Sequence, residues 1–259
     1  MLAVISPAKR LGSCPLPGSI ETTPPRLANE SRKLVQIMRT YDAAGLSELM
    51  HISEAIAEEN VRRFAAWKRT CTGDAEPAVC LFQGDVYRGL AVDGWKPAEH
   101  RRAASHLRIL SGLYGLLRPH DMILPHRLEM GTKLQHARGN GLPAWWGDQI
   151  TKTLANDLEN AKAKAIVNLA SAEYAKAVQW DALPVPMVTC AFQETKDQKH
   201  RTLAAFAKPA RGMFARWMLQ NKPKTAEDLK EFDVQGYAFV PDASEHDTLV
   251  FRRPQPVAA

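Results

Sequence analysis

The chain has 259 residues, of which 45% are hydrophobic and 24% are charged. This composition excludes a chain that is disordered throughout, and the length suits one α/β domain with a sizeable core. The formal net charge of +6 favours polyanionic partners such as nucleic acid, although many cytosolic enzymes are equally basic. No apolar run approaches the roughly 18 residues of a membrane span, and the N-terminus lacks the basic start of a secretory signal. We therefore expect a cytoplasmic protein without a membrane partner.

Four cysteines, Cys14, Cys71, Cys80 and Cys190, are scattered along the chain without a C-x-x-C pair or a histidine at metal spacing. This arrangement predicts reduced thiols, some of them in the core, and neither a disulfide framework nor a zinc site. The glycine-rich patterns that bind nucleoside triphosphates and dinucleotides are also absent. The sequence therefore predicts no metal and no cofactor.

Apolar runs and helical periodicity alternate through the first half of the chain. Leu2–Ile5 reads as a buried strand that ends at Ser6-Pro7, and the Pro-, Gly- and Ser-rich stretch Leu11–Arg26 reads as a long loop. The elements expected next are a helix opened by Thr23-Pro24, a shorter helix from Ser47, a helix over Ser53–Trp67, a strand over Ala78–Phe82 and a helix over Pro97–Arg108.

Two short apolar runs, interrupted by Gly112 and Gly115, follow. A helix, glycine hairpin and second helix here would offer free backbone N–H groups to a DNA phosphate, with Arg108 and Arg118 on either side. The two glycines are one residue further apart than in the usual helix-hairpin-helix, so a plain turn between helices is the alternative.

The second half of the chain continues the alternation of strands and helices. The elements expected there are a helix over Pro143–Leu158, a strand over Ala165–Leu169, a strand pair over Met187–Phe192 and Leu203–Phe206, a helix over Pro209–Leu219 and a closing hairpin over Tyr237–Val240 and Thr248–Arg252. The interleaving predicts a mixed α/β fold in one domain spanning residues 1–259, with a mostly buried central sheet and surrounding helices.

Charged side chains follow four of the predicted strands directly. Ligand crevices in α/β sheets lie at the carboxyl ends of parallel strands, so these side chains would converge on one site. The alternative is that they belong to ordinary caps and turns. The converging residues are Lys9, Asp85, Glu173, Lys176, Lys208 and Arg211.

The segment from residue 118 to residue 131 is the richest in candidate binding residues. Arg118 and Arg127 could each hold a phosphate through two parallel hydrogen bonds. Glu129 lies two residues beyond Arg127, so a structural ion pair between the two is an equal alternative.

Seven stretches of the chain together match the pattern of one known family, essentially from end to end. They are Ile5–Lys9, Phe82–Leu90, Leu107–Pro119, Arg127–Gly131, Asn168–Ser171, Glu173–Tyr174 and Ala210–Gly212. With these stretches the chain resembles the YaaA family, the bacterial peroxide stress resistance proteins. Two positions depart from the family pattern: His126 stands where a tyrosine is expected, and Pro209 stands where a lysine is common.

This resemblance implies a family-specific α/β fold with a positively charged cleft and a helix-hairpin-helix element. It implies duplex or branched DNA as the ligand, and a role in limiting oxidative DNA damage that is linked to low free iron. It does not imply a metal site in the protein.

Two functions therefore follow from the sequence. The first is a monomeric DNA-binding protein with weak sequence specificity, whose phosphate contacts come from Lys9, Arg108, Gly112, Gly115, Arg118, Arg127, Lys176, Lys208 and Arg211. The second is an enzyme that acts on a nucleobase or nucleotide in the same cleft. In that case Lys9 would be the nucleophile, and Asp85 or Glu173 would act as base or stabilise charge.

Overall fold

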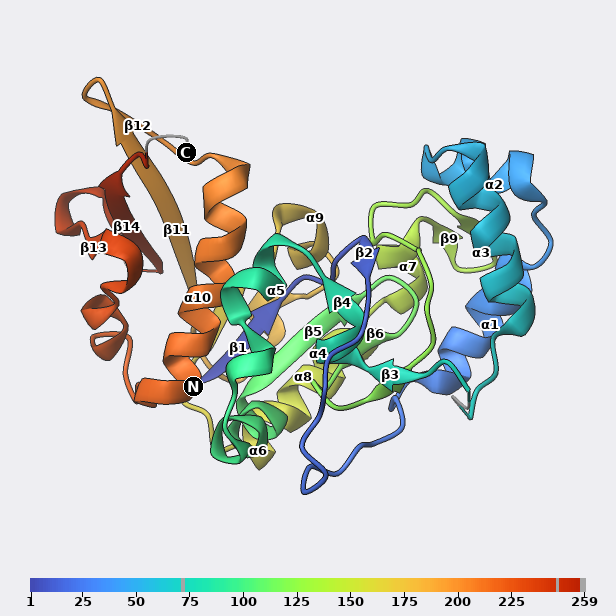
Figure 1. Cartoon of the computed structure of the whole chain (residues 1–259), viewed down its shortest axis with the longest axis horizontal. Coiled ribbons are helices and arrows are strands. Elements are labelled where there is room, and N and C mark those ends of the chain that lie inside the picture. Colours follow the sequence, from blue (N-terminus) through green and yellow to red (C-terminus); the bar gives the residue numbers. More distant parts are fainter. Residues whose placement is uncertain (71–72, 246, 257–259) are drawn as a thin grey trace.

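An eight-stranded mixed sheet runs through the centre of the molecule (Figure 1) in the computed structural model, which describes residues 1–70, 73–245 and 247–256. β12 (Lys199–Arg201) pairs with β11 beside the main path. The order of the other strands is β13 (Ala238–Phe239), β14 (Thr248–Pro254), β11 (Met187–Lys196), β10 (Ile166–Leu169), β1 (Leu2–Ile5), β5 (Leu107–Ser111) and β6 (Gly115–Leu117).

The middle of this sheet is parallel. β1 pairs in parallel with β10 on one side and with β5 on the other, and β10 pairs in parallel with β11. Every residue of β1 is buried, as expected for a central strand that is covered on both faces. The carboxyl ends of β1, β5 and β10 therefore meet at one edge. The sequence predicted this convergence for the strands over 2–5 and 165–169, whereas β5 was expected to be helical.

Ten helices among the described residues surround the sheet. None of them combines the length and the apolar character that crossing a membrane would require. The helices are α1 (Ala28–Met38), α2 (Ala43–Met50), α3 (Glu54–Ala66), α4 (Ala78–Leu81), α5 (Asp85–Leu90), α6 (Pro97–His106), α7 (Leu142–Trp146), α8 (Gln149–Asn160), α9 (Ala172–Ala175) and α10 (Ala204–Asn221).

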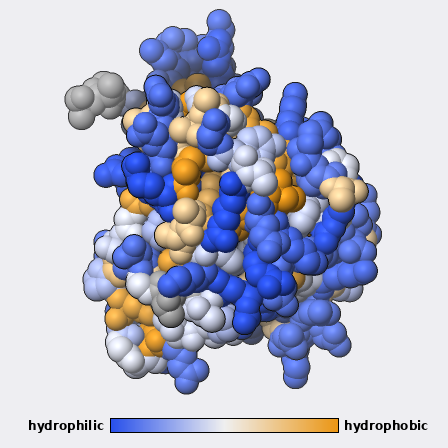
Figure 2. Space-filling view, turned by 90° about the vertical axis from the view of Figure 1, so that its right-hand side faces the viewer, coloured by the Kyte–Doolittle hydropathy of each residue, from blue (hydrophilic) through white to orange (hydrophobic). Residues whose placement is uncertain are grey.

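The helices gather at different ends of the molecule. α1, α2 and α3 lie together at one end, whereas α10 lies beside β11 near the other (Figure 1). Figure 2 faces the α1–α3 end, where hydrophilic side chains cover most of the surface and apolar ones are exposed in limited patches. Three small two-stranded sheets complete the fold: β2 (Arg10–Leu11) with β4 (Phe82–Gln83), β3 (Glu76–Pro77) with β7 (Met122–Ile123), and β8 (Gln135–His136) with β9 (Gly139–Asn140).

α5 and α10 cross with their backbones in contact. A Cβ atom built on Gly212 would overlap the Val86 carbonyl oxygen, and one built on Gly89 would overlap the Pro209 carbonyl oxygen. Only glycine allows two helices to approach this closely. The crossing therefore fixes how the side chains of α5 are placed relative to those of α10.

The predicted helix-hairpin-helix is wrong, because residues 107–117 form a β-hairpin. β5 and β6 pair antiparallel, with Ile109 opposite Leu117. Gly115 has a φ of +69°, which suits the tight turn, and the Tyr114 N–H donates to Ser111 Oγ. The two apolar runs span only three to five residues each, a length that suits buried strands better than helices.

Three other predicted boundaries need correction. Residues 78–81 form helix α4 rather than a strand, and residues 204–206 begin helix α10, so that β12 is the antiparallel partner of β11. The helix predicted over 143–158 is divided into α7 and α8 at Gly147, whose φ of +54° ends the first of them. The closing hairpin is confirmed, because β13 and β14 pair antiparallel.

The prediction of four reduced thiols is wrong as well, because Cys14 and Cys80 form a disulfide. The loop after β2 folds back onto α4, and the Gly12 N–H donates to the Leu81 carbonyl. The sequence separation of 66 positions between the two cysteines hid this proximity in the sequence. Cys190 is free and buried, and burial raises the pKa of its thiol. Cys71 lies outside the described residues.

Candidate functional site: a cationic cavity at the carboxyl edge of the sheet

A cavity of about 520 Å³ opens where β1, β5 and β10 end. Ser6 follows β1, Ser111 is the last residue of β5 and Ser171 follows β10, and all three line the cavity. The Ser171 N–H donates to Ser6 Oγ over 2.9 Å, so a hydrogen bond joins the ends of the two neighbouring strands. A cavity of this size at the carboxyl edge of parallel strands is a typical ligand site.

The structure brings together most of the charged residues that the sequence expected at this edge. Asp85 enters from the first turn of α5 and Glu173 from α9. Lys208 and Arg211 come from α10, where a spacing of three residues puts them on one face. The expected route was wrong in two places, but the convergence occurs. Asp85 follows β4, which lies outside the central sheet, and Lys208 lies within α10 rather than after a strand over residues 203–206. Lys9, Arg127 and Gly112 also line the cavity.

Several of these charges are already paired within the protein. Glu129 accepts from Arg127 at 3.0 Å and from the exposed Lys9 at 2.7 Å. The structural ion pair that the sequence left open for Arg127 is therefore present. Glu173 Oε1 accepts from the Gly131 N–H at 2.8 Å, so this carboxylate holds the loop that follows Glu129.

Arg211 and Lys208 differ from Lys9 and Arg127 and resemble Arg10, a further cation of the cavity without an ion pair among the described residues. In the described part of the chain, neither Arg211 nor Lys208 has a carboxylate within ion-pair distance. Burial lowers the pKa of Arg211, which means that its guanidinium has lost water without gaining a partner. An anionic ligand in the cavity would supply that partner.

Four of the residues predicted to bind phosphate lie elsewhere. Arg108 is buried, and its Nε donates to Asp157 at 2.7 Å, whereas Arg118 donates to Asp121 and to the Pro24 carbonyl. Gly115 packs at the hairpin turn, and Lys176 is exposed beyond the end of α9 without lining the cavity. Arg108 and Arg118 depart from the prediction because each pairs with a buried carboxylate, and the position of that carboxylate in the fold cannot be read from sequence spacing.

Sequence reasoning missed the buried polar side chains at the cavity: Ser6 and Tyr174 line it, and Tyr87 contacts Ser6 without lining it. The Tyr87 hydroxyl donates to the Ser6 carbonyl, and burial together with the neighbouring Tyr174 raises the pKa of Tyr87. Burial also raises the pKa of Tyr174, and the charges of Glu173 and Glu129 raise it further. The position of Ser6 and Ser171 directly after buried strands was the signal that could have identified the serines. No comparable signal marks the tyrosines.

Two buried histidines should make the protein acid-sensitive. His120 lies beside His100, and His126 packs against Phe82 and Tyr114. Burial is the main cause that lowers the pKa of each of the two, His120 and His126, to about 4. Both are neutral in the folded state, whereas the unfolded chain takes up their protons near pH 6.5. The stabilising contribution of each neutral histidine is therefore fully present above pH 6.5. As the pH falls from there to about 4, the free energy of unfolding decreases by roughly 3 kcal/mol per histidine.

Denaturant unfolding at pH 7, 5.5 and 4.5 measures this loss. His120→Gln should flatten the pH dependence, while the exposed His51→Asn should leave it unchanged, since Asn accepts the left-handed backbone at that position. A free energy of unfolding that stays constant from pH 7 to pH 4.5 would contradict the prediction.

The fold and the cavity define an α/β protein with a cationic cavity at the carboxyl edge of its parallel strands. A family model described as "Peroxide stress protein YaaA" matches residues 1–243, and the chain belongs to this family. UPF0246 proteins of Tolumonas auensis and Aliivibrio fischeri are each 44% identical to it, over 98% of both chains. A UPF0246 protein of Cereibacter sphaeroides is also 44% identical, over 98% of this chain and 99% of the relative.

Proposed function

We propose that the protein binds DNA, and that the cavity at the carboxyl edge of the sheet receives the phosphate of one nucleotide. The observation that carries this proposal is the pair of unpartnered cations on α10. Arg211 is partly buried and Lys208 is exposed, and both face a cavity in which Lys9 and Arg127 have a carboxylate partner, while the exposed Arg10 adds further positive charge. A phosphate would complete the hydrogen bonding of the Arg211 guanidinium.

The size of the cavity limits what part of the DNA can enter. A volume of about 520 Å³ is that of a site for a small molecule, so a single unstacked nucleotide fits where a duplex does not. Branched DNA and strand ends offer such nucleotides at little cost, because their bases are already unpaired. Most of the affinity would come from phosphates, so sequence specificity would be weak. Shielding of such exposed nucleotides from oxidation is our proposed link to peroxide stress.

Removal of the positive charges of Lys208 and Arg211 should weaken DNA binding in a salt-dependent manner. We expect Lys208→Ala combined with Arg211→Ala to lower the slope of log affinity against log salt by about two units. Fluorescence anisotropy with labelled branched, duplex and single-stranded DNA measures this slope between about 50 and 200 mM salt.

The matched control removes two exposed lysines from the α8 region, Lys152→Ala combined with Lys164→Ala, so that the net charge changes equally. If both double variants lost the same affinity, the basic charge would act as a general surface property, and the cavity would not be the binding site.

The lysine-dependent enzyme receives less support from the same residues. A Schiff-base lysine needs burial or neighbouring cations, whereas the Lys9 side chain is 65% exposed and is paired with Glu129. Asp85 pairs with Arg88, and Glu173 accepts from the Gly131 N–H, so both carboxylates already have partners within the protein. We therefore propose binding alone as the function of the cavity.

A further inference from the structure

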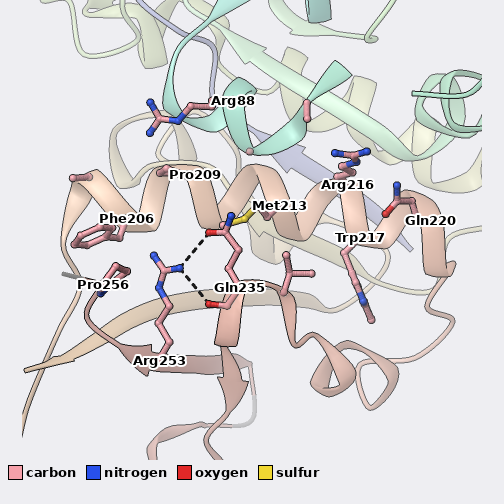
Figure 3. A pocket seen from close by; sticks show the side chains of 14 residues that line it. Arg88, Phe206, Pro209, Met213, Arg216, Trp217, Gln220, Gln235, Arg253 and Pro256 are labelled. Carbon is pink, nitrogen blue, oxygen red and sulfur yellow. Dashed lines mark hydrogen bonds between the residues drawn. The ribbon is translucent and has the colours of Figure 1, made fainter. Parts of the chain in front are cut away.

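A second cavity, of about 590 Å³, lies along α10 (Figure 3). Arg88 enters it from α5, and Arg253 and Gln235 enter from the C-terminal part of the chain. No lining residue is shared with the cavity at the carboxyl edge of the sheet. The wall that α10 contributes consists of Ala205, Phe206, Pro209, Met213, Arg216, Trp217 and Gln220.

The two cavities use different faces of α10. At about 100° per residue, the seven wall residues span an arc of roughly 120°. Lys208 and Arg211 lie roughly 120° to 180° from the centre of that arc. The proposal that follows is therefore independent of DNA binding at the sheet edge.

The charge of this second cavity is one-sided. Three arginines line it, and none of the described lining residues is Asp or Glu. Arg253 is buried and is balanced by Glu194, whose Oε1 lies 3.6 Å from its Nε. Arg88 is exposed and pairs with Asp85, while Arg216 has no carboxylate within ion-pair distance among the described residues.

Unpaired buried donors mark the same place. Four buried side-chain nitrogen or oxygen atoms lack a hydrogen-bond partner in the described part of the chain, and two of them are the Nε atoms of Arg216 and Arg253. Buried donors are almost always satisfied in native proteins, so such a pair indicates a missing acceptor. Glu194 lies beyond hydrogen-bond distance of Arg253 Nε, and no protein acceptor is placed for Arg216 Nε.

The remaining walls suit a planar ring. Phe206, Met213 and Trp217 give apolar surface, and the Arg253 guanidinium lies 5.5 Å from the Phe206 ring centre. Gln220 donates its Nε2 to Glu99, which leaves its carbonyl oxygen to accept a hydrogen bond. Planar bases stack on such aromatic and guanidinium surfaces, and arginines bind phosphate through two parallel bonds.

We propose that this second cavity binds a nucleoside phosphate, with Arg216 holding the phosphate, the base lying over the apolar wall, and Arg88 adding positive charge from the opposite end of the cavity (Figure 3). The nucleotide can be free in solution or can be part of a nucleic-acid strand. The phosphate chemistry is the same in both cases, and the experiment separates them.

Calorimetric titration of the full chain with AMP, GMP, CMP and UMP tests the proposal, with adenosine and inorganic phosphate as the partial ligands. At least one nucleotide should bind, and Arg216→Ala should weaken it at least tenfold. Arg88→Ala, at an exposed position where folding is safe, should weaken it several-fold. The control Arg62→Ala removes an equally exposed arginine of α3 and should change nothing.

Competition then identifies the source of the nucleotide. A single-stranded oligonucleotide that displaces the nucleotide from Lys208→Ala, Arg211→Ala protein would identify a strand-binding site, and failure to displace would identify a site for free nucleotides. The proposal is overturned if no nucleotide binds at millimolar concentration, if inorganic phosphate binds as tightly as a nucleotide, or if Arg88→Ala and Arg216→Ala both bind like the unchanged protein.

Discussion

We expect Gly212→Ala to destabilise the protein by about 4 kcal/mol or more, enough to prevent folding of a marginally stable domain. The added methyl group would overlap the Val86 carbonyl oxygen, which belongs to the backbone of α5. A side chain could rotate away from such a contact, but a helix backbone moves only as a whole. α5 and α10 would have to separate, and the core around Phe214 and Leu90 would open with them.

Denaturant unfolding of the purified variant, or its recovery in the soluble fraction, measures this effect. Gly18→Ala is the matched control, because a methyl group at Gly18 meets no atom within 4 Å and the backbone there is not left-handed. A Gly212→Ala protein within 1 kcal/mol of the unchanged chain would contradict the close crossing of α5 and α10.

The second large effect concerns Asp157, which joins three distant parts of the chain. This carboxylate of α8 accepts two hydrogen bonds from Arg26 in the N-terminal loop and one from Arg108 in β5. Burial opposes its ionisation, but the hydrogen bonds and charges of Arg108 and Arg26 outweigh burial and hold the pKa of Asp157 below its ordinary value. Asp157→Ala would leave the Arg108 guanidinium buried and unpaired, at a cost of about 3–5 kcal/mol.

Thermal and denaturant unfolding of Asp157→Ala measure this cost. Asp148→Ala provides the comparison. Asp148, which precedes α8, pairs with Lys152 of that helix, and both side chains are at least half exposed. Exposed pairs contribute at most about 1 kcal/mol, so this control should stay close to the unchanged protein. Equal losses in the two variants would mean that the buried network adds nothing beyond an ordinary surface pair.

The parts of the fold that could be predicted are those set by local pattern. Leu2–Ile5 is apolar at every position and is followed by Ser6-Pro7, so both the strand and its end were readable. Residues 78–81 are equally apolar but form a helix, because a run of four residues has no period that separates helix from strand. The hairpin at Gly115 was misread for the same reason, and the resemblance to a helix-hairpin-helix reinforced the error.

The candidate site was predictable only where it follows a strand end. Lys9 and Glu173 follow strands of the central sheet as predicted, whereas Lys208 and Arg211 were expected after a strand over residues 203–206 and reach the same cavity from α10, which begins at Ala204. Arg108 and Arg118 were expected to contact phosphate beside the glycine hairpin, but they lie outside the cavity and pair with the buried carboxylates Asp157 and Asp121. The position of a buried carboxylate partner is a property of the folded structure that sequence spacing does not show.

Photo-crosslinking tests whether an unpaired nucleotide of DNA enters the cavity at the carboxyl edge of the sheet. The probe is a DNA duplex that carries one unpaired 4-thiothymidine, and the crosslinked peptides are identified by mass spectrometry. We expect crosslinks to the segments 6–10 and 83–86, which line this cavity. These crosslinks should be lost in the Lys208→Ala, Arg211→Ala protein. Crosslinks confined to other surfaces, such as the α1–α3 end of the molecule, and unchanged in that variant would contradict this expectation.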